Sequence, residues 1–218
     1  MSTSNWEEAK TRSNYHFNKW HRDENAVTHL GKFIGGWQTE IQAVIEDAKP
    51  LNWANRREGT GRENTNINVE AEENDLLQAG ADPKMTIYRG LKDFTKCPSL
   101  QKMTDYFCLE TVKSKLHIQF TGEVLNMHID KLYDLDADYK KVVRIMIMLQ
   151  DWEPGQFLMY GNQIFDAWKS GDIHTFDWPN IPHATANASN KPRPMLVVTG
   201  VKTEQTDKIL SSPIKKRL

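Results

Sequence analysis

Cysteine is scarce in this sequence, long apolar runs are absent, and charges of the two signs nearly cancel. The two cysteines, Cys97 and Cys108, form neither a CxxC motif nor a disulfide framework, which favours a reducing cytoplasm. No apolar run reaches the roughly 18 residues that a membrane span needs, and no basic and apolar leader is found. The formal net charge of −1 gives no overall field to attract nucleic acid or an anionic membrane. We therefore expect a cytoplasmic protein without a nucleic acid or membrane partner.

The length of 218 residues suits one well-buried domain and is short for two. Near residue 115 the sequence changes from segments with helical spacing to short apolar segments separated by turn residues. We expect residues 1–115 to form a helical and irregular support and residues 116–203 to form a β-rich core. Residues 204–218 are interpreted as a solvated C-terminal tail.

Two amphipathic helices are expected in the N-terminal half. Apolar residues recur at helical spacing from Thr28 to Ala48 and again from Ser99 to Lys113. The pair Gly35-Gly36 inside the first helix costs about 1 kcal/mol per glycine relative to alanine, which indicates a close neighbour. The polar segment 52–75 is interpreted as a surface loop, with a lid over a site as the alternative.

From residue 116 onward, short apolar segments alternate with turn residues, as is typical of strands. Pro154-Gly155 fits the centre of a type II turn, and Gly161-Asn162 fits a two-residue hairpin loop. The expected strands are 116–120, 123–130, 142–151, 157–160, 163–168, 173–178, 181–187 and 195–202. This number of strands predicts a β-sandwich or barrel against which the helices pack.

His128-Ile129-Asp130 is the most informative motif of the chain. Residues i and i+2 of an extended segment project from the same face, so His128 and Asp130 would present an imidazole and a carboxylate side by side. His183, from a later strand, would complete the two-histidine, one-carboxylate triad that favours non-haem Fe(II) and leaves coordination positions open. Arg193 follows ten residues after His183. Its permanently charged guanidinium can form two parallel hydrogen bonds with a carboxylate, which suits a dicarboxylate co-substrate.

The segment 123–202 resembles the catalytic core of iron(II)- and 2-oxoglutarate-dependent oxygenases. Within them it is most similar to the aspartyl/asparaginyl β-hydroxylase-like branch. The resemblance rests on His128-Ile-Asp130, Arg144-Ile-Met-Ile-Met-Leu149, Trp168-Lys-Ser-Gly-Asp172, His183-Ala-Thr-Ala-Asn187 and Arg193-Pro-Met-Leu-Val-Val. It implies a mainly β fold with some α-helix: a jelly-roll, cupin-like double-stranded β-helix of two antiparallel sheets, one of them buttressed by N-terminal helices.

The same resemblance implies roles for single residues. His128, Asp130 and His183 would ligate iron as the catalytic centre, and Arg193 would pair with the distal carboxylate of 2-oxoglutarate. Arg144 matches an arginine that this branch places near the co-substrate, although Met146 stands where a polar residue is expected.

Asn187 shares the strand face of His183, so we expect it in the co-substrate pocket or in contact with a ligand residue. His174 is interpreted as a hydrogen-bonded structural histidine, and Met146 and Met148 are interpreted as core residues.

The implied activity is that of a dioxygenase, a hydroxylase that uses Fe(II), 2-oxoglutarate and O2. It would hydroxylate a substrate C–H bond and release succinate and CO2. The substrate could be a small molecule or a peptide side chain, because fold and cofactor are shared across many substrates. Two alternatives stay open. One is a cupin-like metalloenzyme that does not use 2-oxoglutarate, for which Arg193 would have no such role, and the other is a noncatalytic β-helix binding domain.

Overall fold

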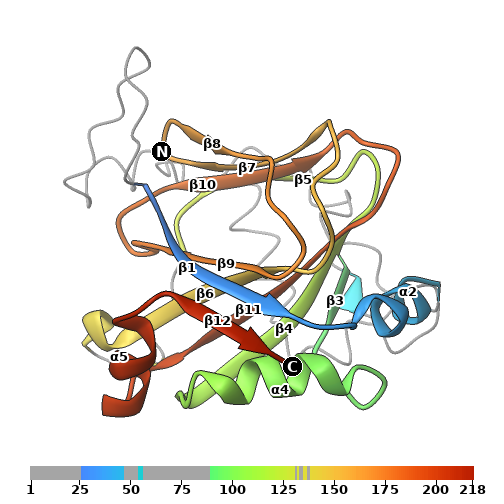
Figure 1. The fold of residues 1–218 in the computed structure, drawn as a ribbon. Helices are drawn as coiled ribbons and strands as arrows, with labels where there is room; N and C mark the ends of the chain where they lie inside the picture. Colours follow the sequence, from blue (N-terminus) through green and yellow to red (C-terminus); the bar gives the residue numbers. More distant parts are fainter. Residues whose placement is uncertain (1–25, 47–53, 56–88, 131, 133–134, 137) are drawn as a thin grey trace.

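The computed structural model describes residues 26–46, 54–55, 89–130, 132, 135–136 and 138–218. Its strands form two sheets that lie face to face as a β-sandwich (Figure 1). The architecture is the mainly β, jelly-roll type with a few helices that the sequence predicts. None of the helices in this described part is long and apolar enough to span a membrane.

The larger sheet has eight strands in the order β12-β1-β9-β6-β11-β4-β3-β2. Their bounds are β1 Val27–Ile34, β2 Ala54–Asn55, β3 Arg89–Leu91, β4 Glu110–Gln119, β6 Val142–Met148, β9 Asp172–Phe176, β11 Arg193–Val201 and β12 Ile214–Arg217. Neighbours are antiparallel except β1 and β12, which pair in parallel. The order places β6, β11 and β4 side by side, although they come from distant parts of the chain.

The smaller sheet has four antiparallel strands in the order β5-β10-β7-β8. Their bounds are β5 Val124–His128, β7 Gln156–Tyr160, β8 Gln163–Phe165 and β10 His183–Asn187. β7 and β8 form the hairpin predicted around Gly161-Asn162. The predicted turn before β7 is also present: Gly155 has φ of 94°, and the Gln156 N–H donates to the Glu153 carbonyl over 3.0 Å.

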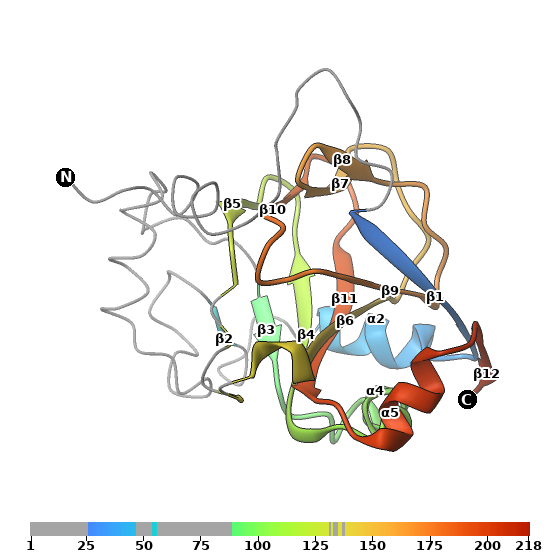
Figure 2. The ribbon, with the colours of Figure 1, turned by 90° about the vertical axis from the view of Figure 1, so that its left-hand side faces the viewer.

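The helices α2 (Gln38–Glu46), α4 (Pro98–Tyr106) and α5 (Glu204–Leu210) lie on the side of the larger sheet that faces away from the smaller one (Figure 2). A 3-10 turn, η2 (Tyr139–Lys141), precedes β6. Side chains of α2 and α4 are buried with those of the sheet in one core, which includes Ile41, Val44, Leu100, Met103, Leu116, Ile118, Ile145, Ile147 and Leu196. Each such side chain contributes about 1.5–3 kcal/mol by leaving water, so the helices buttress the sheet as expected.

Strand β6 is apolar at every position except Arg144 because both of its faces are covered. Ile145 and Ile147 belong to the core under the helices, whereas Met146 and Met148 belong to a second core between the two sheets. The prediction that the two methionines are core residues is confirmed. The second core also contains Tyr160 of the smaller sheet, which places that core next to the end of β10.

The helix predicted from Thr28 to Ala48 is wrong in its first half. Residues 27–34 form β1, and the helix begins only at Gln38; residues 47 and 48 lie outside the described residues. β1 contains a bulge between His29 and Gly31, so Leu30 and Phe33 both reach the same core although they are three residues apart. Core residues three positions apart normally indicate a helix, and here the bulge produces the same spacing in a strand.

Gly31 explains the bulge. Its φ is 127°, and a β-carbon there would lie 2.1 Å from the Ile214 carbonyl oxygen of β12. Gly35-Gly36, expected inside a helix, instead joins β1 to α2. A β-carbon at Gly35 would lie 3.0 Å from the Trp37 ring, while Gly36 has nothing within 4 Å.

Two further boundaries differ from expectation. The second helix ends at Tyr106 rather than Lys113, because Cys108 has a positive φ and the chain enters β4 at Glu110. The C-terminal residues form α5 and β12 rather than a plain tail, and α5 starts with a capping box between Thr203 and Thr206. Of the segment 52–75, proposed as a loop or lid, only β2 is described.

Candidate metal centre

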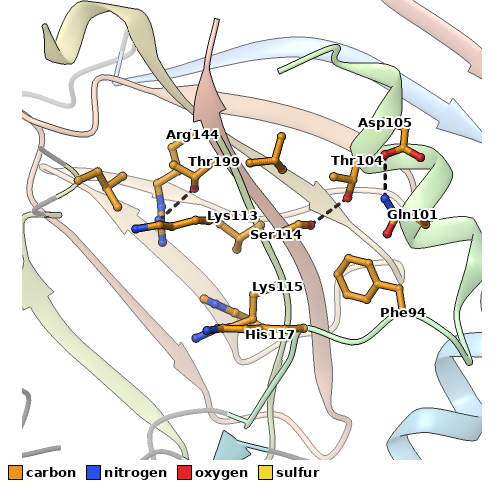
Figure 3. A pocket seen from close by; sticks show the side chains of 14 residues that line it. Phe94, Gln101, Thr104, Asp105, Lys113, Ser114, Lys115, His117, Arg144 and Thr199 are labelled. Atoms are coloured by element: carbon orange, nitrogen blue, oxygen red, sulfur yellow. Dashed lines mark hydrogen bonds between the residues drawn. The ribbon is translucent and has the colours of Figure 1, made fainter. Parts of the chain in front are cut away.

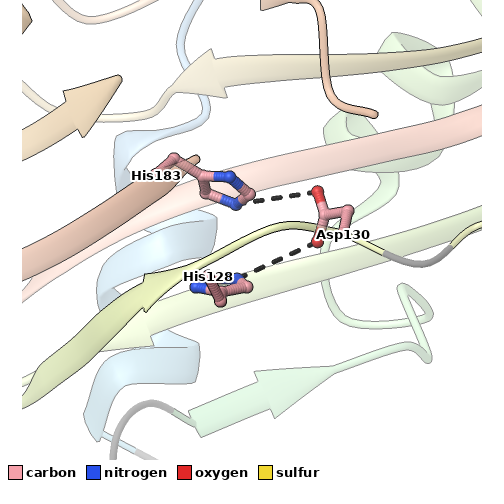
Figure 4. Close-up of side chains that lie close together, drawn as sticks. All are labelled: His128, Asp130 and His183. Carbon is pink, nitrogen blue, oxygen red and sulfur yellow. Dashed lines mark ion pairs between the residues drawn. The ribbon is translucent and has the colours of Figure 1, made fainter. Parts of the chain in front are cut away.

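Three side chains meet at one end of the smaller sheet. His128 ends β5, Asp130 follows two residues later, and His183 begins β10. His128 and His183 are direct partners in the β5–β10 ladder, so the register sets the two imidazoles side by side, with ring centroids 4.3 Å apart. Figure 4 shows the three side chains turned toward one another. The structure thus brings together the residues that the motif singled out.

The spacing of the donor atoms suits one metal ion. The Nε2 of His128 lies 3.9 Å from Oδ1 of Asp130, and the Nε2 of His183 lies 3.6 Å from Oδ2. One ligand atom of each residue lies within 4.8 Å of the other two. Metal–ligand bonds of about 2.1 Å would set neighbouring donors about 3 Å apart, so a small inward shift of the side chains completes the site. Two imidazoles and a carboxylate are the donor set of non-haem Fe(II) sites with open positions.

Burial keeps His183 in the form that binds a metal. Removal from water lowers the pKa of the His183 imidazole to about 3, His128 acts in the same direction, and Asp130 opposes both. At neutral pH the ring is therefore uncharged and retains the lone pair that a metal needs.

Arg144 lies against the same carboxylate. Its Nε is 2.9 Å from Oδ2 of Asp130, and its Nη1 is 3.4 Å from the Thr199 hydroxyl. Arg144 comes from β6 of the larger sheet, so this ion pair joins the two sheets at the centre. It also orients Asp130, whose Oδ1 faces His128. A direct contact between Arg144 and a co-substrate stays a prediction.

Arg193 begins β11 and is buried with an exposed fraction of 4%. Its Nη2 donates to Oε1 of Gln119, its partner in the β11–β4 ladder, and its Nη1 lies 3.9 Å from the Met195 sulfur. Burial lowers the pKa of the guanidinium to about 10, so it is cationic at neutral pH. In the described parts of the chain no carboxylate pairs with it. Because a buried charge without a counter-charge costs several kcal/mol, the arrangement suits an anionic ligand.

One narrow cavity is lined by both His183 and Arg193, together with Arg144, Tyr160 and Gln119. Its volume is about 30 Å³, which corresponds to one or two water molecules. His183 of the candidate metal group and the buried cation Arg193 therefore face the same space, which Gln119 also lines.

Asn187 does not line the cavity but holds the backbone of Gln119 and of the β10–β11 connection in place. Its amide donates to the carbonyls of Gln119 and Lys191, each over 2.8 Å, and its Oδ1 accepts from the backbone and the hydroxyl of Ser189. These bonds tie the β10–β11 connection to β4. The structure thus places Asn187 behind Gln119, and its contact with a co-substrate stays a prediction.

His174 is a buried structural histidine, as predicted. Its Nε2 pairs with the Tyr160 hydroxyl over 2.9 Å, and burial lowers the pKa of its imidazole to about 3. Tyr160 in turn is the ladder partner of His183 and stacks on it with centroids 6.1 Å apart. No sequence pattern points to Tyr160 or Gln119 as site residues, because their positions depend on strand register.

Neither a protein-family model nor the sequence of a curated protein matches the chain. Among solved structures, it is similar to the non-haem α-ketoglutarate-dependent epimerase SnoN of nogalamycin biosynthesis, with a TM-score of 0.52, 9% identity, and coverage of 81% of this chain and 79% of that chain. A prolyl-4-hydroxylase of Pseudomonas putida gives a TM-score of 0.42 at 14% identity, covering 83% and 94%. A cupin 2 conserved barrel domain protein of Salinispora arenicola gives 0.31 at 13%, covering 46% and 71%.

The likeness to SnoN shows the fold, a β-sandwich of two facing sheets. It does not single out the aspartyl/asparaginyl β-hydroxylase-like branch, which stays a prediction from the sequence motifs.

Proposed function

We propose that the protein is an Fe(II)- and 2-oxoglutarate-dependent dioxygenase that hydroxylates a substrate C–H bond and releases succinate and CO2. The proposal is carried by one observation: a two-histidine, one-carboxylate group stands beside a cavity that also holds a buried arginine without a carboxylate partner among the described residues. A group of two histidines and one aspartate, or a buried arginine, can each be purely structural when it occurs alone. Side by side, they match what a ferrous ion and a dicarboxylate require.

When bound, Fe(II), 2-oxoglutarate and O2 would supply the oxidising chemistry. The chain's own residues hold and orient these groups. His128, Asp130 and His183 would take three positions on the ion and leave the rest open. Arg144 fixes the rotation of the Asp130 carboxylate through its ion pair. The pairing of Tyr160 with His174 holds the ring that stacks on His183.

Arg193 is the residue that would select the co-substrate. A carboxylate can form two parallel hydrogen bonds with a guanidinium, whereas the amide oxygen of Gln119 offers a single neutral acceptor. The cavity of about 30 Å³ is too small for 2-oxoglutarate beside Gln119. We therefore infer that the co-substrate carboxylate replaces the Gln119 side chain on Arg193.

The experiment is an anaerobic titration of the pure protein with Fe(II) and then with 2-oxoglutarate. The expected result is the weak visible charge-transfer band of a chelated keto acid. Arg193→Glu should abolish 2-oxoglutarate binding and leave Fe(II) affinity unchanged, because Arg193 is not a ligand residue. An unchanged co-substrate affinity in this variant would remove the arginine assignment.

A cupin-like metalloenzyme without 2-oxoglutarate is the second candidate, favoured by the bond that Gln119 already forms with Arg193. Iron binding without the visible band would support it. Failure to bind iron at all would instead support a noncatalytic binding domain.

The sequence motifs place the proposed enzyme nearest the aspartyl/asparaginyl β-hydroxylase-like branch, a placement that does not imply an aspartyl or asparaginyl substrate. The free thiols of Cys97 and Cys108 fit the proposed cytoplasmic location.

A further inference from the structure

Tyr160 and His174 form a hydrogen-bonded pair between the two sheets. Tyr160 ends β7 of the smaller sheet, His174 lies in β9 of the larger sheet, and the Tyr160 hydroxyl is 2.9 Å from the His174 Nε2. Both side chains are buried, and neither belongs to the candidate metal group. The direction of this hydrogen bond determines whether the Tyr160 O–H is used within the pair or is available to a ligand.

Burial keeps His174 uncharged. Removal from water, followed by His29 and Arg193, lowers the pKa of its imidazole to about 3, so at neutral pH the ring has one N–H and one lone pair. Its Nδ1 is buried and has no hydrogen-bond partner among the described residues. Protein interiors tolerate an acceptor without a donor better than an N–H without an acceptor. The lone pair therefore belongs on Nδ1, and the N–H on Nε2 donates to the Tyr160 oxygen.

This direction leaves the Tyr160 proton available to the small cavity. Tyr160 lines that cavity together with Arg193, whose Nε is likewise buried without a hydrogen-bond partner in the described part of the chain. Burial raises the pKa of the Tyr160 hydroxyl, and Arg193 is the strongest opposing charge, so the group is protonated at neutral pH and lies in the field of the guanidinium. In the free protein, one or two water molecules fit in the cavity and can accept the proton.

The two donors line the small cavity but not the larger one beside it. The larger cavity has a volume of about 770 Å³, and Figure 3 shows the side chains that line it. Arg144 and His117 line both cavities, whereas Tyr160 and Arg193 line only the small one. A ligand group held by both Tyr160 and Arg193 must therefore enter the small cavity.

A carboxylate can accept from both donors at once. Its two oxygens offer about four lone-pair positions, and a guanidinium takes two of them when it forms two parallel hydrogen bonds. A remaining position can accept the O–H of Tyr160. With the opposite direction of the Tyr160–His174 bond, the phenol would instead turn only lone pairs toward the carboxylate and repel it.

We propose that Tyr160 is a second donor to the co-substrate carboxylate beside Arg193, and that His174 is a positioning residue whose Nε2–H directs the Tyr160 proton into the cavity. The inference rests on the proposed function for the identity of the carboxylate, which is that of 2-oxoglutarate. It does not rest on the proposed function for the direction of the hydrogen bond.

The tautomer of His174 is the first test, because it needs neither metal nor co-substrate. NMR of the full chain labelled with ¹⁵N-histidine distinguishes an Nε2–H ring from an Nδ1–H ring. The expected result is Nε2–H for His174, which is identified by its through-space contact with the Phe165 ring, with centroids 4.4 Å apart. An Nδ1–H ring would mean that Tyr160 donates to His174, and it would overturn the inference.

The second test is calorimetry of 2-oxoglutarate binding to the Mn(II)-loaded protein in the absence of oxygen. Tyr160→Phe should weaken binding about tenfold, because a hydrogen bond to a charged group is lost. His174→Phe should weaken binding by a similar factor, and the double variant no further than Tyr160→Phe alone, since His174 acts through Tyr160. His174→Gln keeps an N–H that can donate to Tyr160, so it should restore most of the affinity.

Phe165→Leu is the matched control. Phe165 packs against both Tyr160 and His174 but has no polar side-chain atom, so this variant should bind 2-oxoglutarate as the unaltered protein does. An effect as large as that of His174→Phe, or multiplied effects in the double variant, would show a purely structural role and overturn the inference.

Two outcomes separate this inference from the proposed function. If the unaltered protein binds no 2-oxoglutarate, the proposed function is rejected, while the tautomer of His174 still decides the direction of the hydrogen bond. Should His174→Phe fail to fold, the tautomer and Tyr160→Phe decide the question, and unchanged co-substrate affinity in Tyr160→Phe would overturn the inference.

Discussion

Gln119 offers the sharpest test of how the co-substrate enters. Its side chain is buried and its amide oxygen accepts a hydrogen bond from Arg193, so the proposed co-substrate, 2-oxoglutarate, would have to displace it. A hydrogen bond to a charged group contributes about 1.5–3 kcal/mol net. Gln119→Ala should therefore lower the free energy of unfolding by about that amount in the absence of ligand. The same change removes the competitor and should tighten 2-oxoglutarate binding about tenfold, since about 1.4 kcal/mol corresponds to a factor of ten.

Gln119→Glu is the matched variant, because it keeps the size of the side chain and supplies a carboxylate to Arg193. It should weaken 2-oxoglutarate binding at least about tenfold while the protein stays folded. The assay is anaerobic calorimetry with Mn(II) as a redox-silent metal, combined with urea unfolding. Equal co-substrate affinity in the unaltered protein and both variants would refute the reasoning.

Two further predictions concern stability. The imidazole of His174 has its pKa lowered from 6.5 to about 3, so the unfolded chain takes up a proton between these pH values and the folded chain does not. The free energy of unfolding should then fall by about 1.4 kcal/mol per pH unit below 6.5 on account of this residue, and urea unfolding of His174→Phe should show a correspondingly flatter pH dependence. Identical slopes would contradict this. Gly31→Ala would place a β-carbon 2.1 Å from the Ile214 oxygen at a φ of 127°, so it should separate β12 from β1 and lower the melting temperature, whereas Gly36→Ala, which meets nothing within 4 Å, should change it little.

The sequence predicted the β-rich core because its signals are local. The hairpin at Gly161-Asn162 and the turn at Pro154-Gly155 each depend on a few adjacent residues, and β6 is apolar apart from Arg144 and has an ordinary strand length. Strand β1 could not be predicted in the same way. The inserted residue of its bulge changes the spacing between core-facing residues from two to three, which is the spacing of a helix.

The three residues of the metal group could be predicted from His-x-Asp and a later histidine, but their surroundings could not. The contacts of Arg144 with Asp130 and of Gln119 with Arg193 depend on which strands are neighbours and in which register. The start of β4 could not be predicted for another reason: the apolar spacing from Ser99 to Lys113 predicts a helix, and the alternation of Lys113, Lys115 and His117 has meaning only in a strand.

The central claim is that His128, Asp130 and His183 bind one metal ion. A crystal structure of the protein with Mn(II) and 2-oxoglutarate tests it most directly. The account predicts one ion bonded to both imidazole Nε2 atoms and to the Asp130 carboxylate, with the distal carboxylate of the co-substrate on Arg193 in place of Gln119. An ion bound elsewhere, or these three side chains left without metal at saturating Mn(II), would contradict it.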